Sequence, residues 1–198
     1  MQAEQERGTE KLQLWRDQIA AFSFPRWNEL PEIDLYMDQV VGYLSQKLSV
    51  FYDNNDDRRS ITATMINNYV KQKIIAPPVK KRYGRAALSA LMVLFCAKQV
   101  LSIGHSGLLI AESRGGSEQN DEAAAAFYDR FCRIFEEVLH RTVAEDTDSS
   151  YLAQLCGEDR VLAVTAAAFA NQIYAERMLG QTETTADSES RTGQEEPT

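Results

Sequence analysis

Residues 62–83, TATMINNYVKQKIIAPPVKKRY, decide the fold. Thr62 can cap a helix, and Ile66 and Val70 lie four residues apart on one face, so the sequence predicts a short helix as far as about Gln72. The outer face of this helix carries only amide, hydroxyl and basic groups. The segment therefore predicts a helix that packs by one apolar stripe and presents a polar surface.

A basic wing is expected directly after this helix. Pro77 and Pro78 cannot continue the helix, and residues 79–83, VKKRY, indicate a brief extended segment. Helical periodicity resumes at about Arg85, with apolar residues on one face. The sequence thus predicts three elements in a row: a helix with a polar outer face, a wing, and a second helix with an apolar face.

The same region is an island of positive charge. Residues 58–111 contain nine Lys or Arg and no Asp or Glu, although the chain holds 29 acids and has a net charge of −8. Because the island contributes +9, the remaining residues carry −17. A basic surface in an acidic protein concentrates favourable potential where a polyanion can dock, and DNA is the commonest polyanion. A solvated basic face without a partner is the alternative.

The outer face of the predicted helix suits DNA. In helix-turn-helix proteins the N-terminal part of the second helix meets base edges in the major groove, and Asn can pair with adenine. A hydroxyl and free amides in the first turn suit a phosphate, and basic wing residues suit the flanking backbone. The candidate DNA-binding residues are Thr62, Thr64, Asn67, Asn68, Tyr69, Lys71, Lys80, Lys81, Arg82 and Tyr83.

Three of these residues have structural alternatives. Asn67 and Asn68 are also compatible with ordinary exposed amides on a helix. Tyr83 fits core packing better than a surface role, although its hydroxyl could still reach a phosphate from there.

The segment ITATMINNYVKQKIIAPPVKKRYGRAALSALMVLFCAKQVLSI, residues 61–103, resembles the winged helix-turn-helix of MerR-type regulators. In those proteins the second helix ends in a Tyr. A Leu-Leu-x-Pro turn, a basic wing with a Tyr and a helix with Leu at i and i+3 then follow. The matching positions here are Tyr69, Ile74, Ile75, Pro77, Tyr83, Leu88 and Leu91. The resemblance implies a MerR-like fold and DNA binding.

Residues 31–103 also resemble an uncharacterised protein family of Gram-positive bacteria that is itself classed as MerR-like. The shared pattern is LYMDQV, then ITxxMINNYVK, then PxKKxY. This second resemblance implies the same fold and DNA binding, and it brings no assigned activity.

The chain departs from the MerR pattern in several places. A long polar loop, residues 53–60, separates the first two helices. Lys73 takes the place of the usual Gly at the helix end, so a non-Gly residue is expected in a left-handed conformation, at a cost of about 1 kcal/mol. Asn67 stands where a DNA-contacting Arg is usual. The C-terminal region reads as several helices instead of one long dimerisation helix.

Four regions are predicted along the chain. They are an N-terminal helical extension at 1–30, the MerR-like winged helix-turn-helix domain at 31–112, a C-terminal helical region for dimerisation or effector binding at 121–180, and a disordered tail at 181–198. The tail has no large apolar residue, so it cannot offset the entropy cost of ordering. Asp34 is expected to cap the helix that precedes the loop. The expected fold class is all-α apart from the small wing.

Aromatic residues outside the module are expected to form core. Trp15, Phe22, Phe24 and Trp27 would join the N-terminal segment to the module. The spacing of Phe127, Phe131 and Phe135 is typical of helix packing, within one protomer or across a dimer. A small-molecule pocket among the C-terminal helices stays open as an alternative.

The composition argues against several other classes. Cys96, Cys132 and Cys156 are widely spaced, which fits reduced thiols in a cytoplasmic protein better than disulfides or a zinc site. His105 and His140 have no metal-ligand spacing around them. No apolar run predicts a membrane helix, and the polar start does not resemble a signal peptide. No nucleophile–base pair, phosphate loop or carboxylate dyad predicts an enzyme, and no cofactor is expected.

The sequence therefore predicts a DNA-binding transcriptional regulator that docks its recognition helix and basic wing on promoter DNA. A homodimer is expected, since one short helix reads few base pairs and a two-fold operator doubles that number. The alternative is a protein-interaction module whose basic face binds an acidic partner.

Overall fold

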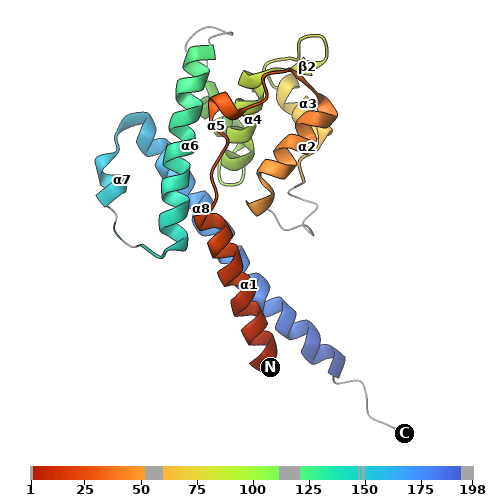
Figure 1. Ribbon diagram of the computed structural model, residues 1–198, viewed down its shortest axis with the longest axis vertical. Coiled ribbons are helices and arrows are strands. Elements are labelled where there is room, and N and C mark those ends of the chain that lie inside the picture. The colour runs from red at the N-terminus through yellow and green to blue at the C-terminus, as the bar shows by residue number, and fades with distance from the viewer. Residues whose placement is uncertain (1, 52–59, 112–120, 147, 149, 193–198) are drawn as a thin grey trace.

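The computed structural model describes residues 2–51, 60–111, 121–146, 148 and 150–192. These residues are mostly helical, with a single two-stranded sheet among them, so the all-α prediction is confirmed. Figure 1 shows a body of packed helices from which two helices extend side by side as an arm. They are α1 (Gln2–Ala20) and the C-terminal part of α8 (Gly157–Thr192).

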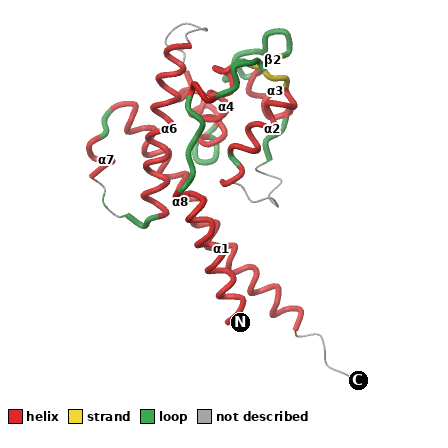
Figure 2. Tube along the Cα trace, in the orientation of Figure 1, coloured by secondary structure: helices red, strands yellow, loops and turns green. Residues whose placement is uncertain are grey.

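The middle of the chain forms a small module of helices and two short strands. In chain order it contains the short helix η1 (Trp27–Glu29), β1 (Leu35–Tyr36), α2 (Met37–Lys47), the short helix η2 (Ser49–Phe51), α3 (Ala63–Lys71), β2 (Arg82–Tyr83), α4 (Arg85–Ala97) and α5 (Ile103–Ala111). The two strands lie against α2, and Figure 2 shows β2 at the same side of the molecule as α2 and α3. Most of the predicted loop 53–60 lies outside the described residues.

The start of α2 differs from the sequence prediction. The sequence predicts a cap at Asp34, but Leu35 and Tyr36 form β1, and Tyr36 is the N-cap of α2. β1 pairs with β2 in antiparallel register, with Leu35 opposite Tyr83. Strand pairing prevails over an earlier helix start because it buries both of these side chains on one face of the sheet.

Helix α4 is the centre of the core. All seven residues from Leu91 to Ala97 have 0% exposure, so this helix is enclosed on every side. Helices α2, α5, α6 (Asp121–Val143) and α8 pack against it. Burial of one large apolar side chain contributes about 1.5–3 kcal/mol. Helix α4 therefore fixes the positions of the elements that carry the candidate site.

An aromatic cluster joins the N-terminal segment to α6 and α8. The ring of Phe24 lies 5.5 Å from that of Phe131 and 6.1 Å from that of Phe135, centroid to centroid. Phe51 lies 5.2 Å from Phe169 of α8 in the same way. The three phenylalanines of α6 predicted to pack do so within the protomer, because all are buried in this single chain.

The predicted role of the N-terminal aromatic residues as core is confirmed. Trp15 and Phe24 are buried, and Phe22 and Trp27 pack against the core at its edge. The indole of Trp15 also donates a hydrogen bond of 3.0 Å to the carbonyl of Val50. These contacts attach α1 and the following segment to the module, as expected.

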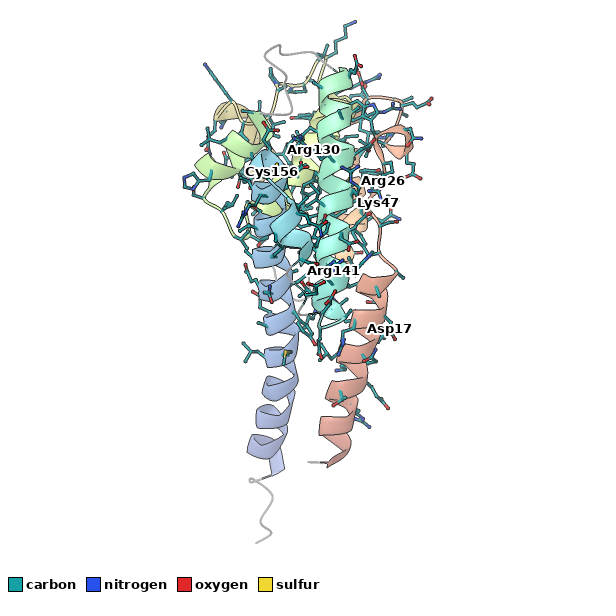
Figure 3. The ribbon with its side chains drawn as sticks, turned by 90° about the vertical axis from the view of Figure 1, so that its left-hand side faces the viewer. Asp17, Arg26, Lys47, Arg130, Arg141 and Cys156 are labelled. Carbon is teal, nitrogen blue, oxygen red and sulfur yellow. The ribbon has the colours of Figure 1, made fainter. Side chains whose placement is uncertain are left out.

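A buried carboxylate reinforces this attachment. Glu136 of α6 is 8% exposed; it accepts a 2.7 Å hydrogen bond from the backbone amide of Phe24 and pairs with Arg26 at 2.5 Å. Arg26 lies beside α6 in Figure 3. Glu136 therefore ties the segment between α1 and η1 to the long helix α6 by two charge-assisted contacts.

The C-terminal region contains α6, α7 (Ser150–Gln154) and α8. Composition predicts disorder from residue 181, but α8 continues as far as Thr192, and residues 193–198 lie outside the described residues. A helix that has already formed extends by one hydrogen bond for each residue fixed. For residues 193–198 the predicted disorder stays a prediction.

The cysteines and histidines have ordinary environments. Cys96 and Cys132 are buried free thiols and Cys156 is an exposed one. Burial raises the pKa of Cys132 to about 12 and also raises that of Cys96. The Nε2 atom of His140 lies 3.0 Å from the carbonyl oxygen of Phe22, which fits the predicted structural role. No helix in the described ranges is long and apolar enough to cross a membrane.

Candidate nucleic-acid interface

Helix α3 forms as its sequence predicts. The side-chain oxygen of Thr62 accepts a hydrogen bond of 3.3 Å from the amide of Met65, which caps the first turn. Ile66 is fully buried and Val70 packs against the core. The opposite face is exposed and consists of Thr64, Asn67, Asn68 and Lys71. This face offers hydrogen-bonding groups of both kinds and one positive charge to solvent.

Tyr69 belongs to the buried side of α3. It is 7% exposed, and its ring lies 5.9 Å from that of Phe95 in α4 in an edge-on arrangement. Burial raises the pKa of its hydroxyl. Its main contribution is to dock α3 on α4, which sets the direction in which the polar face points.

The end of α3 has the strained conformation that the sequence predicts. Lys73 has φ of 60°, the left-handed region usually taken by Gly. The amide of Ile74 donates to the carbonyl of Tyr69 at 3.0 Å and that of Lys73 donates to the carbonyl of Val70 at 3.0 Å. This is the Schellman pattern of helix ends. It turns the chain so that Ile75 enters the core and the prolines lead to the wing.

The wing is a hairpin with a two-residue turn. Val79 and Arg82 exchange both backbone hydrogen bonds, at 3.0 and 2.9 Å, and Lys80 and Lys81 form the turn between them. Their φ angles are 49° and 65°. Two consecutive positive φ values are typical of a type I′ turn, for which Asn-Gly is the preferred sequence. Two lysines there cost about 1 kcal/mol each or more.

The two faces of the small sheet differ in exposure. Leu35 and Tyr83 are buried on the inner face, at 8% and 3% exposure. Tyr36 and Arg82 are opposite one another and exposed on the outer face. Burial places Tyr83 in the core, as the sequence favours, and raises the pKa of its hydroxyl. A contact of that hydroxyl with a phosphate stays a prediction.

The basic residues of α3 and the wing are exposed and pair with none of the described carboxylates. Within the described part of the chain, none of Lys71, Lys80, Lys81 and Arg82 forms an ion pair, and all four are exposed. By contrast, Arg26, Arg130 and Arg141 of the body are each paired with carboxylates. Among the described residues these four cations therefore differ from the arginines of the body in having no carboxylate partner.

One residue next to this surface was not anticipated from the sequence. Tyr36 lies under Arg82, whose Cζ atom is 4.7 Å from the centre of the tyrosine ring. The Nη2 atom of Arg82 also donates a 2.8 Å hydrogen bond to the hydroxyl of Tyr36. The pair is 46 residues apart in sequence, and only the antiparallel register of β1 and β2 brings it together.

A cavity lies among the C-terminal helices, where the sequence analysis kept a small-molecule pocket as an alternative. Its volume is about 380 Å³, and residues of α6, α7 and α8 line it, among them Val138, Arg141, Tyr151 and Tyr174. Arg141, visible on α6 in Figure 3, is paired with Glu137 and Asp146. Among the described residues, no group of three or more His, Cys, Asp or Glu is placed to hold a metal ion.

Comparison with known proteins defines the family but assigns no activity. The family model described as "Domain of unknown function (DUF1836)" matches residues 25–131. No curated protein and no solved structure matches the chain. The matched residues include α3, the wing and α4, and they extend past the predicted boundary at 112 into the first half of α6. Since the match spans more than half of the sequence, the chain belongs to the DUF1836 family.

Proposed function

We propose that this protein is a transcriptional regulator that binds DNA through a MerR-like winged helix-turn-helix. The observation that carries the proposal is the exposed polar face of α3, followed in the chain by an exposed basic wing. None of Lys71, Lys80, Lys81 and Arg82 pairs with a carboxylate among the described residues. The order strand, helix, helix, hairpin and helix, from β1 to α4, supports the MerR-like assignment.

In the proposed complex α3 enters the major groove. Thr64, Asn67 and Asn68 face the base edges, where an Asn amide can donate to N7 of adenine and accept from its N6 amino group. Thr62 and the free amides of the first turn contact a phosphate, as helix N-termini commonly do. Lys71 neutralises a neighbouring phosphate, and no covalent chemistry takes place.

The wing contacts the DNA backbone beside the groove. Its turn presents Lys80 and Lys81 at the tip of the hairpin, and Arg82 follows on the exposed face of the sheet. Each phosphate that a basic residue neutralises adds about 0.9 to the slope of log K against log salt. These three cations therefore supply affinity, and the α3 amides supply sequence preference.

The proposed regulator acts as a homodimer. Helix α3 has nine residues, so a single copy reads only a few base pairs. A second copy on a two-fold operator doubles the number of base pairs read. The C-terminal helices would provide the dimer contact or an effector site.

A protein-interaction module is the second candidate. The exposed cations that suit DNA would also suit an acidic partner protein. Charge reversal at Lys80 and Lys81 separates the two candidates. If the protein is a DNA-binding regulator, the reversal abolishes retention of DNA. If it is a protein-interaction module, the reversal abolishes only retention of the partner protein.

The proposal is tested by binding to a pool of genomic DNA fragments at physiological salt. Wild type is expected to enrich particular fragments, and Asn67→Ala/Asn68→Ala to lose that selectivity while keeping part of the affinity. The matched control is Gln13→Ala/Gln18→Ala, which removes two exposed amides from α1 and should behave as wild type. Weak binding that is blind to sequence and equal in all three proteins would refute specific DNA recognition.

A further inference from the structure

The outer face of the small sheet holds one arginine in a defined orientation. Arg82 stacks on the ring of Tyr36, with its Cζ atom 4.7 Å from the ring centre, and donates a 2.8 Å hydrogen bond to the tyrosine hydroxyl. The residue on its other side is Val79, which pairs with Arg82 across the hairpin. Arg82 is therefore the middle of a row of three exposed side chains.

This orientation is not explained by the stability of the fold alone. Tyr36 is 44% exposed and Val79 66% exposed, so the row lies at the surface and covers little of the core. An arginine free in solvent samples many rotamers, and contact with one tyrosine by both stacking and a hydrogen bond restricts them. The guanidinium retains donors that Tyr36 does not use, because it has five N–H groups.

The restricted guanidinium suits a phosphate. Arg binds phosphate oxygens with two parallel N–H groups, and a guanidinium that is already oriented loses less entropy when it does so. Among the described residues no carboxylate pairs with Arg82, so none of them neutralises its charge. The neighbouring turn, with its two strained lysines, places further positive charge beside the same position.

We infer that Tyr36 is a positioning residue, which holds Arg82 in the orientation that binds a DNA backbone phosphate next to the groove occupied by α3. This inference rests on the proposed function. The inference adds Tyr36 of β1, which lies outside α3 and the wing, to the interface. Tyr36 acts on DNA through Arg82.

The test is a double-mutant cycle measured by fluorescence anisotropy on the fragment that wild type selects most strongly. Arg82→Ala is expected to lower affinity about tenfold or more, since it removes a charge-assisted contact, and to lower the salt slope by about 0.9. Tyr36→Leu should lower affinity about three- to fivefold, because the released guanidinium regains rotamer freedom that binding must then restrict. The salt slope should not change, because Arg82 still neutralises its phosphate.

The decisive comparison is made in the absence of Arg82. Tyr36→Leu should then have no further effect, because Tyr36 acts only through the guanidinium. Tyr36→Phe keeps the ring and removes only the hydroxyl, so it should retain most of the affinity even if Tyr36→Leu proves poorly folded. Circular dichroism on each variant checks the fold.

Two results would overturn the inference while leaving the proposed function intact. In one, Tyr36→Leu and Arg82→Ala reduce affinity additively, which would mean that Tyr36 touches DNA itself or supports the sheet. In the other, Tyr36→Leu binds as tightly as wild type. Failure of the proposed function is a separate outcome, since wild type would then select no fragment.

Discussion

The strained turn of the wing yields the sharpest prediction. Lys80→Asn/Lys81→Gly installs the sequence preferred for a type I′ turn, at two positions whose φ angles are 49° and 65°. A left-handed conformation costs an ordinary residue about 1–2 kcal/mol, and Gly adopts it freely. The variant should therefore be more stable than wild type by about 1–2 kcal/mol, which corresponds to a rise in Tm of about 3–6 °C for a chain of this length.

The same substitution should weaken DNA binding. It removes two cations, and with each neutralised phosphate contributing about 0.9, the salt slope should fall by about 1.8. A fourfold rise in salt, from about 50 to about 200 mM, would then weaken wild type about twelvefold more than the variant. The turn would thus be a place where the sequence keeps charge at the expense of stability.

A matched variant separates strain from charge. Lys80→Gln/Lys81→Gln removes the same two charges but keeps residues with side chains in the left-handed conformation. It should match the Asn-Gly variant in DNA affinity and salt slope, and wild type in Tm. Thermal unfolding and anisotropy titrations at several salt concentrations measure both quantities. Equal Tm values for the two variants would refute the strain argument, and an unchanged salt slope would refute the contact of the wing with DNA.

Three further predictions concern the remainder of the fold. Lys73→Gly should raise the free energy of unfolding in urea by about 1 kcal/mol relative to Lys73→Ala, because only Gly adopts φ near 60° without strain; equal stability would contradict this. Glu136→Gln should lower the free energy of unfolding by about 2 kcal/mol, since the substitution leaves Arg26 without its charged partner. The control Glu137→Gln, on the half-exposed side of the same helix, should lower the free energy of unfolding by less than about 0.5 kcal/mol. A thiol reagent at about pH 8 should modify only Cys156 in the native protein, because the thiolate is the reactive species and burial raises the pKa of Cys96 and Cys132; rapid reaction of a second thiol before unfolding would show that the core is open.

Local features of the module could be predicted from the sequence. The hydroxyl cap at Thr62, the apolar stripe of α3 and the left-handed residue at Lys73 each depend on residues within one or two helical turns. The basic wing was evident from its prolines and charges. Its turn conformation was not, because lysine is a poor residue for positive φ and gives no signal for a type I′ turn.

Features that depend on distant residues could not be predicted. The pairing of β1 with β2 decides where α2 begins and brings Tyr36 to Arg82, yet the two strands have only two residues each. An apolar Leu35 followed by Tyr36 is as compatible with the first turn of a helix as with a strand. Similarly, the aromatic contacts of Phe51 with α8 and the pairing of α1 with α8 join opposite parts of the chain. Helical periodicity shows which face is apolar but does not identify the partner of that face.

The central claim is that Asn67 and Asn68 of α3 read base edges in the major groove. The most direct test replaces adenines in the selected DNA fragment by 7-deazaadenine, which lacks the N7 acceptor of that groove. Wild type should lose about tenfold in affinity at one or two positions, as expected for a broken amide–adenine pair, and Asn67→Ala/Asn68→Ala should be insensitive to the same replacements. Equal affinity of wild type for natural and modified DNA at every adenine, or an equal loss in both proteins, would contradict base reading by this helix.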